Sequence, residues 1–279
     1  MSRFKEYLKH PFSFAVMLLV VISALITVSV VVFIIGYILI KGIPNLSADL
    51  FSLKYNSENQ SMLPSVFNTL LLTMLTLLIA VPVGVFSAVY LVEYAKKGSK
   101  FVRLIRITNE TLAGIPSIVY GLFGFLAFVI AKGWGYSLKA GIITLAVMVL
   151  PLIIRTTEEA LIAVTDSYRE GSYGLGAGKL RTIFRIIIPS AMPGILSGVI
   201  LAIGRIVGET AALIYTAGTV PDAAENLSSS TRTLSVHLYC LLNEGLFTQQ
   251  AYATAVVLLI VVLVINALSN LIAKRMTKA

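Results

Sequence analysis

Long apolar runs without charge alternate with short polar connections along most of the chain. No Asp, Glu, Lys or Arg lies between Lys9 and Lys41, and none lies between Glu58 and Glu93. A helix that crosses the hydrocarbon core of a bilayer needs roughly 20 apolar residues. The pattern therefore predicts an all-α integral membrane protein, with one transmembrane domain over residues 1–279 and about six membrane-crossing helices. We expect these helices at residues 14–40, 65–92, 108–131, 137–157, 194–217 and 250–272.

One polar, glycine-rich stretch, residues 166–189, separates two of the apolar runs. Ser167-x-x-Glu170 has the spacing of a capping box, so a helix should begin there. Glycines then interrupt it, and a second amphipathic helix should run from Lys179 to Pro189 with Leu180, Ile183, Phe184 and Ile187 on one face. The stretch predicts two short helices that lie parallel to the membrane surface and face a partner.

Composition and charge agree with a membrane protein and indicate its orientation. Only 13% of residues are charged and 57% are apolar, whereas soluble chains average about a quarter charged residues. Of the 22 Lys and Arg residues, 16 lie on alternate connections and 5 on the opposite ones. Because basic residues accumulate in cytoplasmic loops, both termini and residues 166–189 should face the cytoplasm. The net charge of +9 thus needs no nucleic-acid partner.

The sequence contains no recognisable enzyme site. It has no phosphate-binding loop of the type Gly-x-x-x-x-Gly-Lys-Ser/Thr and no HExxH motif. Cys240 is the single cysteine, and His10 and His237 do not have the spacing of metal ligands. We therefore expect no catalytic residue, no metal and no cofactor. If ATP drives this protein, another chain hydrolyses it.

Two charges lie within the fifth predicted helix, in the segment Arg205-Ile-Val-Gly-Glu209-Thr210. A charge in the membrane interior costs about 2.5–3.5 kcal/mol on insertion scales, so such residues usually line a pathway. The i, i+4 spacing lets Arg205 and Glu209 pair on one helix face. One interpretation is a solute path in which Arg205, Glu209 and Thr210 meet an anion. The other is an ion pair that only stabilises the helix bundle.

The spacing within residues 166–189 resembles the cytoplasmic EAA loop of permeases from ABC importers. Glu170, Gly171 and Ser172 stand where that family has Glu-Ala-Ala, Gly176 follows after three residues, and Ile186-x-Ile188-Pro189 ends the pattern. The resemblance implies the type I ABC importer permease fold. It also implies that the loop docks on a separate ATPase through Arg169, Glu170, Gly171, Ser172, Gly176, Ile186 and Pro189.

Two further stretches resemble the permease subunits of phosphate-specific ABC importers. They are Gly114–Phe123 and Arg205–Ala211. The sequences of Gly208–Leu213 and of Arg232–His237 resemble more closely the second, or A, subunit of the paired permeases. The resemblance implies import of inorganic phosphate across the cytoplasmic membrane. The implied partners are a homologous second permease, a dimer of ATP-binding subunits, an extracytoplasmic phosphate-binding protein and membrane lipid.

Two alternatives stay open. A permease for sulfate, molybdate or tungstate would share the docking loop and differ only in cargo. A secondary transporter or channel would have inverted repeats and charges in several discontinuous helices, and it would not need a docking loop.

Overall fold

The computed structural model describes residues 11–96 and 98–276. All regular structure in these residues is helical. The basic residues Arg3, Lys5, Lys9, Lys97 and Lys278, which entered the charge count, lie outside the described residues. The α-helices are α2 (Pro11–Gly42), α3 (Leu63–Val89), α4 (Lys100–Ala113), α5 (Ser117–Gly124), α6 (Leu138–Ile162), α7 (Asp166–Gly174), α8 (Lys179–Thr182), α9 (Ile188–Val207), α10 (Ala211–Thr216), α11 (Leu234–Glu244) and α12 (Thr248–Met276). Short 3-10 segments, η1 (Ile43–Asn45) and η2 (Ala48–Phe51), and π-helical segments, η3 (Tyr90–Tyr94), η4 (Phe125–Ala131) and η5 (Ile183–Ile187), extend or link them.

Five single helices in the described residues are long and apolar enough to cross a membrane, and a bent pair raises the number to six. The five are Phe12–Asn45, Leu63–Tyr94, Leu138–Ile162, Lys179–Val207 and Thr248–Arg275. This confirms the predicted all-α fold with about six membrane-crossing helices. The expected ranges 14–40, 65–92, 137–157 and 250–272 begin and end within five residues of α2, α3, α6 and α12.

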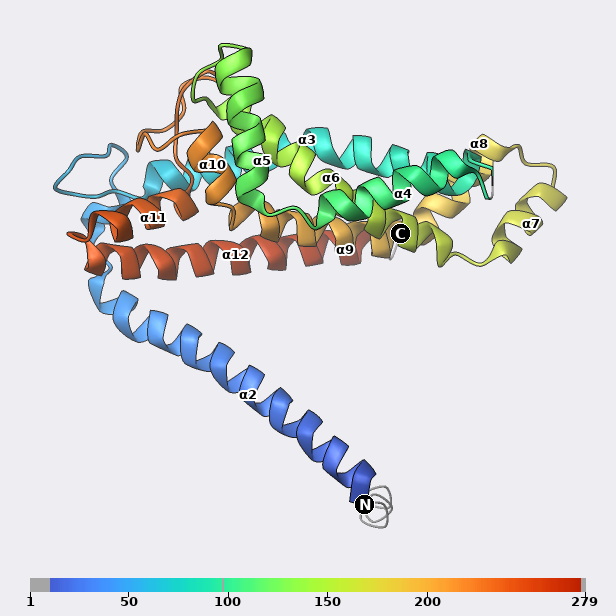
Figure 1. The fold of residues 1–279 in the computed structure, drawn as a ribbon, viewed down its shortest axis with the longest axis horizontal. Helices are drawn as coiled ribbons and strands as arrows, with labels where there is room; N and C mark the ends of the chain where they lie inside the picture. Colours follow the sequence, from blue (N-terminus) through green and yellow to red (C-terminus); the bar gives the residue numbers. More distant parts are fainter. Residues whose placement is uncertain (1–10, 97, 277–279) are drawn as a thin grey trace.

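Helix α6 occupies the centre of the bundle, between α3 and α9 (Figure 1). Its residues Leu145, Met148 and Ile153 are fully buried in the main hydrophobic cluster. Helix α9 can approach α6 closely because Gly198 has no Cβ, and a Cβ there would overlap Thr156 Oγ1. A larger residue there would push the two helices apart, so this small-residue position serves packing within the chain.

Helix α2 leaves the bundle and extends away from it (Figure 1). None of its most apolar 18-residue window is buried. Its end is fixed near α12, where the Tyr37 and Tyr252 hydroxyls lie 3.3 Å apart. The apolar surface of α2 is therefore accessible along most of its length in the isolated chain.

The helix predicted over residues 108–131 is broken into two pieces. The chain bends by 100° between Lys100–Ala113 and Ser117–Ala131. Pro116 has no N–H to donate and disfavours helical backbone at Ile115, so the helix ends before it. Helix α4 begins at Lys100 and includes Arg103 and Arg106.

The predictions around residues 166–217 also need correction. Pro189 does not close a separate surface helix, because a continuous helix runs from Lys179 to Val207. The wider π-helical turn of η5 precedes Pro189, where its missing N–H would interrupt a regular α-helix. The expected helix at 194–217 ends instead at Val207, and residues 211–216 form the separate helix α10.

Candidate functional site: a clamped surface helix and an interrupted membrane helix

Helix α7 lies at one end of the bundle, where α6 ends and α8 begins (Figure 1). Its N-cap is Thr165, whose extended backbone ends the turn after α6. The helix therefore starts one residue before Ser167, and the capping box expected between Ser167 and Glu170 is wrong. The Ser167 hydroxyl instead lies 3.1 Å from the Thr165 hydroxyl.

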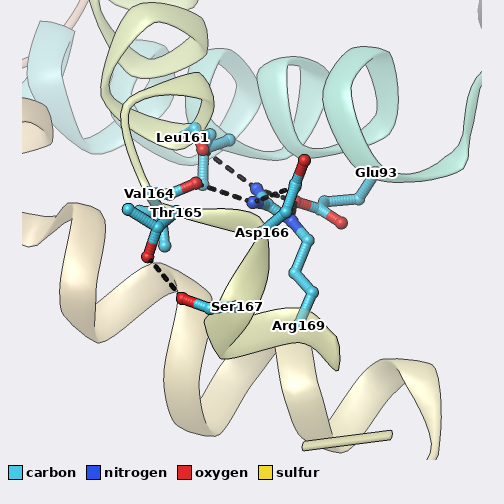
Figure 2. A network of polar contacts seen from close by, with 7 residues as sticks. All are labelled: Glu93, Leu161, Val164, Thr165, Asp166, Ser167 and Arg169. Atoms are coloured by element: carbon cyan, nitrogen blue, oxygen red, sulfur yellow. Dashed lines mark hydrogen bonds and ion pairs between the residues drawn. The ribbon is translucent and has the colours of Figure 1, made fainter. Parts of the chain in front are cut away.

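Arg169 connects α7 to two other elements (Figure 2). Its Nη2 and Nε donate to Glu93 Oε1 at 2.8 and 3.1 Å, and Glu93 belongs to η3, which continues α3. Its Nη1 and Nη2 also donate to the Val164 and Leu161 carbonyl oxygens at 2.8 and 3.0 Å. A third carboxylate contact, to Asp166 Oδ1 at 3.1 Å, lies within α7 itself.

The Arg169–Glu93 pair is largely shielded from water. The side chains are 15% and 6% exposed, respectively. Charge-assisted hydrogen bonds are about twice as strong as neutral ones, and removing one partner of a shielded pair leaves the other charge without compensation. The pair therefore holds α7 firmly to the ends of α3 and α6.

The motif residues after Arg169 form the turn between α7 and α8. Gly176 has φ of +80°, a conformation that glycine adopts without steric cost, and its N–H donates to Tyr173 O at 2.9 Å. Ser172 and Thr182 are buried, and their hydroxyls lie 2.8 Å apart, which ties α7 to α8. The glycine-broken stretch is thus a tight hairpin of two helices.

The outer surface of this hairpin combines charge and exposed apolar side chains. Glu170 is exposed, and Leu175 and Leu180 are 91% and 64% exposed. Ile183 and Ile187 are fully buried against α3 and α6, whereas Leu180 and Phe184 of the expected apolar face are exposed. Of the remaining motif residues, Gly171 and Pro189 are exposed and Ile186 is half-buried.

The second group of expected site residues lies where α9 ends. Arg205 is half-buried in the last turn of α9, and Glu209 and Thr210 lie in the break before α10. Glu209 is 7% exposed, and its Oε1 accepts a hydrogen bond from the Ala212 N–H at 3.0 Å. The carboxylate therefore caps the N-terminus of α10 and interacts favourably with the positive end of the helix dipole.

The expected pairing of Arg205 with Glu209 is wrong for the described chain. No ion pair joins them, because the helix that would align them at i, i+4 ends at Val207. Glu209 instead faces α10, and among the described residues Arg205 has no acidic side chain within ion-pair distance. A half-buried guanidinium without a carboxylate partner can bind an anionic solute.

Helix α10 packs directly on α5, so the two stretches quoted for phosphate permeases meet in space. A Cβ at Gly121 would lie 2.7 Å from Ala212 Cα, and one at Gly124 would lie 2.7 Å from Thr216 Cγ2. Only glycine allows this approach. Residues 114–123 and 205–211 thus border the same region, beside Arg205.

Sequence reasoning did not identify two of the charge partners. In the sequence, Glu93 marks the end of an uncharged run. A carboxylate at a helix end beside a basic loop is also well placed to form an ion pair. Arg106 of α4 pairs with Glu158 of α6 at 2.5 Å, and Glu158 is 13% exposed. Arg155 and Glu159, on the same end of α6, form an exposed pair instead.

Comparison with known proteins agrees with these features. The model of the family described as binding-protein-dependent transport system inner membrane component matches residues 80–278. The probable ABC transporter permease protein YqgI of Bacillus subtilis (strain 168) is 34% identical over 278 residues, which cover 92% of this chain and 94% of that one. The phosphate transport system permease protein PstA of Yersinia pestis is 36% identical over 237 residues, 83% of this chain and 80% of that one.

Solved structures support the fold. A chain of a bacterial alginate ABC transporter, in complex with an alginate pentasaccharide-bound periplasmic protein, has a TM-score of 0.70 at 18% identity, covering 99% of this chain and 98% of that one. A chain of the inward-facing MetNI methionine ABC transporter has a TM-score of 0.61 at 19% identity, with coverages of 87% and 98%. The chain belongs to the family of binding-protein-dependent transport system inner membrane components.

Proposed function

We propose that this chain is the permease subunit of an ATP-driven ABC importer that carries inorganic phosphate across the cytoplasmic membrane. The observation that carries the phosphate assignment is the similarity to PstA of Yersinia pestis over most of both chains. The half-buried Arg205, which has no acidic partner in the described chain, fits an anionic cargo. The chain itself is a transporter subunit and not an enzyme.

The partners follow from this function. A homologous permease would complete a heterodimer, with Arg205, Glu209 and Thr210 beside the shared path. One subunit of an ATP-binding dimer would dock on the α7–α8 hairpin through Glu170 and the exposed Leu175, and the other subunit would dock on the partner permease. An extracytoplasmic phosphate-binding protein would deliver the anion at the opposite end, and both termini would lie in the cytoplasm.

The fold supports a direct mechanical connection between the α7–α8 hairpin, where the ATPase would dock, and the solute path beside Arg205. The Arg169–Glu93 pair would make α7 and α3 move together when the ATPase subunits close. The continuous helix from Lys179 to Val207 runs from the hairpin to Arg205, a distance of about 40 Å at 1.5 Å per residue. A displacement at the hairpin would thus reach the α9–α10 break without a flexible joint.

The test is uptake by the purified transporter in proteoliposomes that contain the partner permease, the ATPase and the binding protein. We expect ATP-dependent accumulation of ³²P-phosphate, and no accumulation of ³⁵S-sulfate at the same concentration. Accumulation of sulfate, molybdate or tungstate in place of phosphate would assign the chain to another oxyanion importer. Uptake without ATP, driven by an ion gradient, would contradict the ABC assignment.

A further inference from the structure

A buried polar cluster formed by Arg232 and His237 lies at the start of α11, at the end of the bundle opposite α7 (Figure 1). Its backbone is fixed to α3. The Asn68 Nδ2 donates to Arg232 O at 3.1 Å, and the Leu234 N–H donates to Thr69 Oγ1 at 2.8 Å. The Arg232 N–H is also bonded, to Val220 O at 2.9 Å. This arrangement holds the side chains of Arg232 and His237 in place.

Arg232, Thr233 and His237 contain most of the unpaired buried polar atoms of the described chain. Arg232 is 4% exposed and His237 is 0% exposed. Of the eight buried side-chain nitrogen and oxygen atoms without a hydrogen-bond partner in the described residues, five belong to Arg232, Thr233 and His237. Buried polar atoms are almost always paired, so such a concentration calls for an explanation.

The surroundings of Arg232 contain no acidic partner. No carboxylate lies within ion-pair distance of its guanidinium in residues 11–96 and 98–276. The nearest groups are the ring of Tyr55, whose centroid is 4.9 Å from Arg232 Cζ, and the half-buried Cys240. A buried charge is costly unless it is paired. The cluster thus offers a positive charge that no carboxylate of the described residues neutralises.

We propose that Arg232 and His237 form a binding site for a tetrahedral oxyanion, with inorganic phosphate as the expected ligand. The guanidinium would donate through Nε and Nη2, which have no hydrogen-bond partner in the described residues, and the neutral imidazole of His237, which lies beside the Gln60 backbone, would complete the polar lining. The identity of the anion and its arrival from outside rest on the proposed function. The site is separate from Arg205, which lies on α9.

The imidazole has the protonation state that this role requires. Burial, and then the charge of Arg232, lower the pKa of His237 to about 3. At neutral pH the ring is therefore uncharged and carries one N–H donor. The positive charge of the site resides on Arg232 alone, so a bound anion could leave again, as transport requires.

The segment that covers the cluster is a compact loop with its own hydrogen bonds. Tyr55 packs edge-on against His237, with ring centroids 6.4 Å apart. The Tyr55 hydroxyl donates to Gln60 Oε1 at 2.9 Å, and Asn56 and Asn59 bond within the same loop. Binding at this site requires the loop to shift as a unit and uncover the guanidinium. A small anion could then enter, whereas a carboxylate on the surface of another protein would not reach so deep.

The single cysteine of this chain provides the measurement. Burial raises the pKa of the Cys240 thiol, and the adjacent Arg232 guanidinium acts in the opposite direction. An anion on Arg232 would cancel that second effect, reduce the thiolate fraction and slow alkylation. We would expose the purified complete transporter to N-ethylmaleimide with increasing phosphate, and follow the Cys240 peptide by mass spectrometry.

We expect phosphate to slow the alkylation of Cys240 severalfold and saturably, and sulfate to act similarly at higher concentration. The Arg232→Gln variant should lose this protection, while Arg205→Gln should keep it. No protection by phosphate, or equal protection by chloride at the same ionic strength, would overturn the proposal. Protection only when an acidic surface of the binding protein is present would overturn it as well, because it would assign the site to a docking carboxylate. None of these results depends on whether the transporter imports phosphate.

Discussion

Arg169 on the surface helix α7 and Glu93 at the end of the membrane helix α3 form a shielded ion pair, with Nη2 and Oε1 2.8 Å apart. The two residues are separated by 76 positions in the sequence. Because the guanidinium also binds two carbonyl oxygens at the end of α6, it joins three elements at one point. Force applied to α7 would therefore be transmitted to the membrane helices and not dissipated in a loop.

Glu93→Gln should uncouple ATP hydrolysis from uptake. The amide keeps the shape of the side chain but removes the charge, and a charge-assisted hydrogen bond contributes about 1.5–3 kcal/mol. We expect less phosphate imported per ATP hydrolysed, measured in proteoliposomes. Asp166→Asn is the matched control, because Asp166 also contacts Arg169 but is 76% exposed and should matter little. Equal losses in both variants would mean that shielding is irrelevant.

Gly176→Ala should weaken docking of the ATPase, while Gly171→Ala should not. Gly176 has φ of +80°, where a Cβ costs roughly 1–2 kcal/mol. Gly171 is helical and a Cβ there would meet nothing within 4 Å. Co-purification of the ATPase with each variant measures the difference. Full retention by Gly176→Ala would show that the turn tolerates distortion.

Glu170→Arg should abolish ATP-coupled uptake and leave the permease in the membrane. The residue is exposed on α7 and forms no ion pair within the described residues, so a stability effect is not expected. Membrane content by immunoblot and uptake in vesicles separate the two quantities. Normal uptake by this variant would remove α7 from the docking surface.

Gly121→Val should impair transport through the packing of α5 on α10. A Cβ at this position would lie 2.7 Å from Ala212 Cα, which is backbone and cannot rotate away. The helices would have to separate and displace Arg205, at a cost of about 1–3 kcal/mol. Gly36→Val, where nothing lies within 4 Å, is the control for expression and assembly. Comparable uptake by the two variants would contradict a role for this contact.

The folded transporter should lose thermal stability as the pH falls from about 6.5 toward 3. His237 is neutral in the folded chain because its pKa is about 3, whereas an unfolded chain would take up a proton below about 6.5. Protons then favour the unfolded state over this interval, and stability is retained above it. Melting temperatures of the wild type and His237→Gln across this range measure the effect. An identical pH dependence in both would assign it to other groups.

The sequence was sufficient for the class of fold because membrane crossing depends on local composition. The uncharged runs located α2, α3, α6 and α12, and the stretch with Glu170 and Gly176 located the α7–α8 hairpin. The positions at which helices end were harder to predict. A proline inside a run can end a helix, as Pro116 does, or follow a π-helical turn, as Pro189 does, and neighbouring helices decide which occurs.

Charge partners could not be predicted for a similar reason. The i, i+4 rule suggested Arg205 with Glu209, but the break after Val207 directs Glu209 to the N-terminus of α10. Arg169 and Glu93 come together only because α7 folds back toward the end of α3. Long-range pairs of this kind depend on the tertiary arrangement, and no local pattern records them.

The most direct test of the account is phosphate uptake by the complete transporter carrying Arg205→Gln, compared with Arg205→Lys. We expect the neutral variant to lose ATP-dependent uptake of ³²P-phosphate while it still assembles with the ATPase, and the lysine variant to retain part of it because the charge is kept. Normal uptake by Arg205→Gln would contradict the assignment of Arg205 to the anion path and leave it a structural residue.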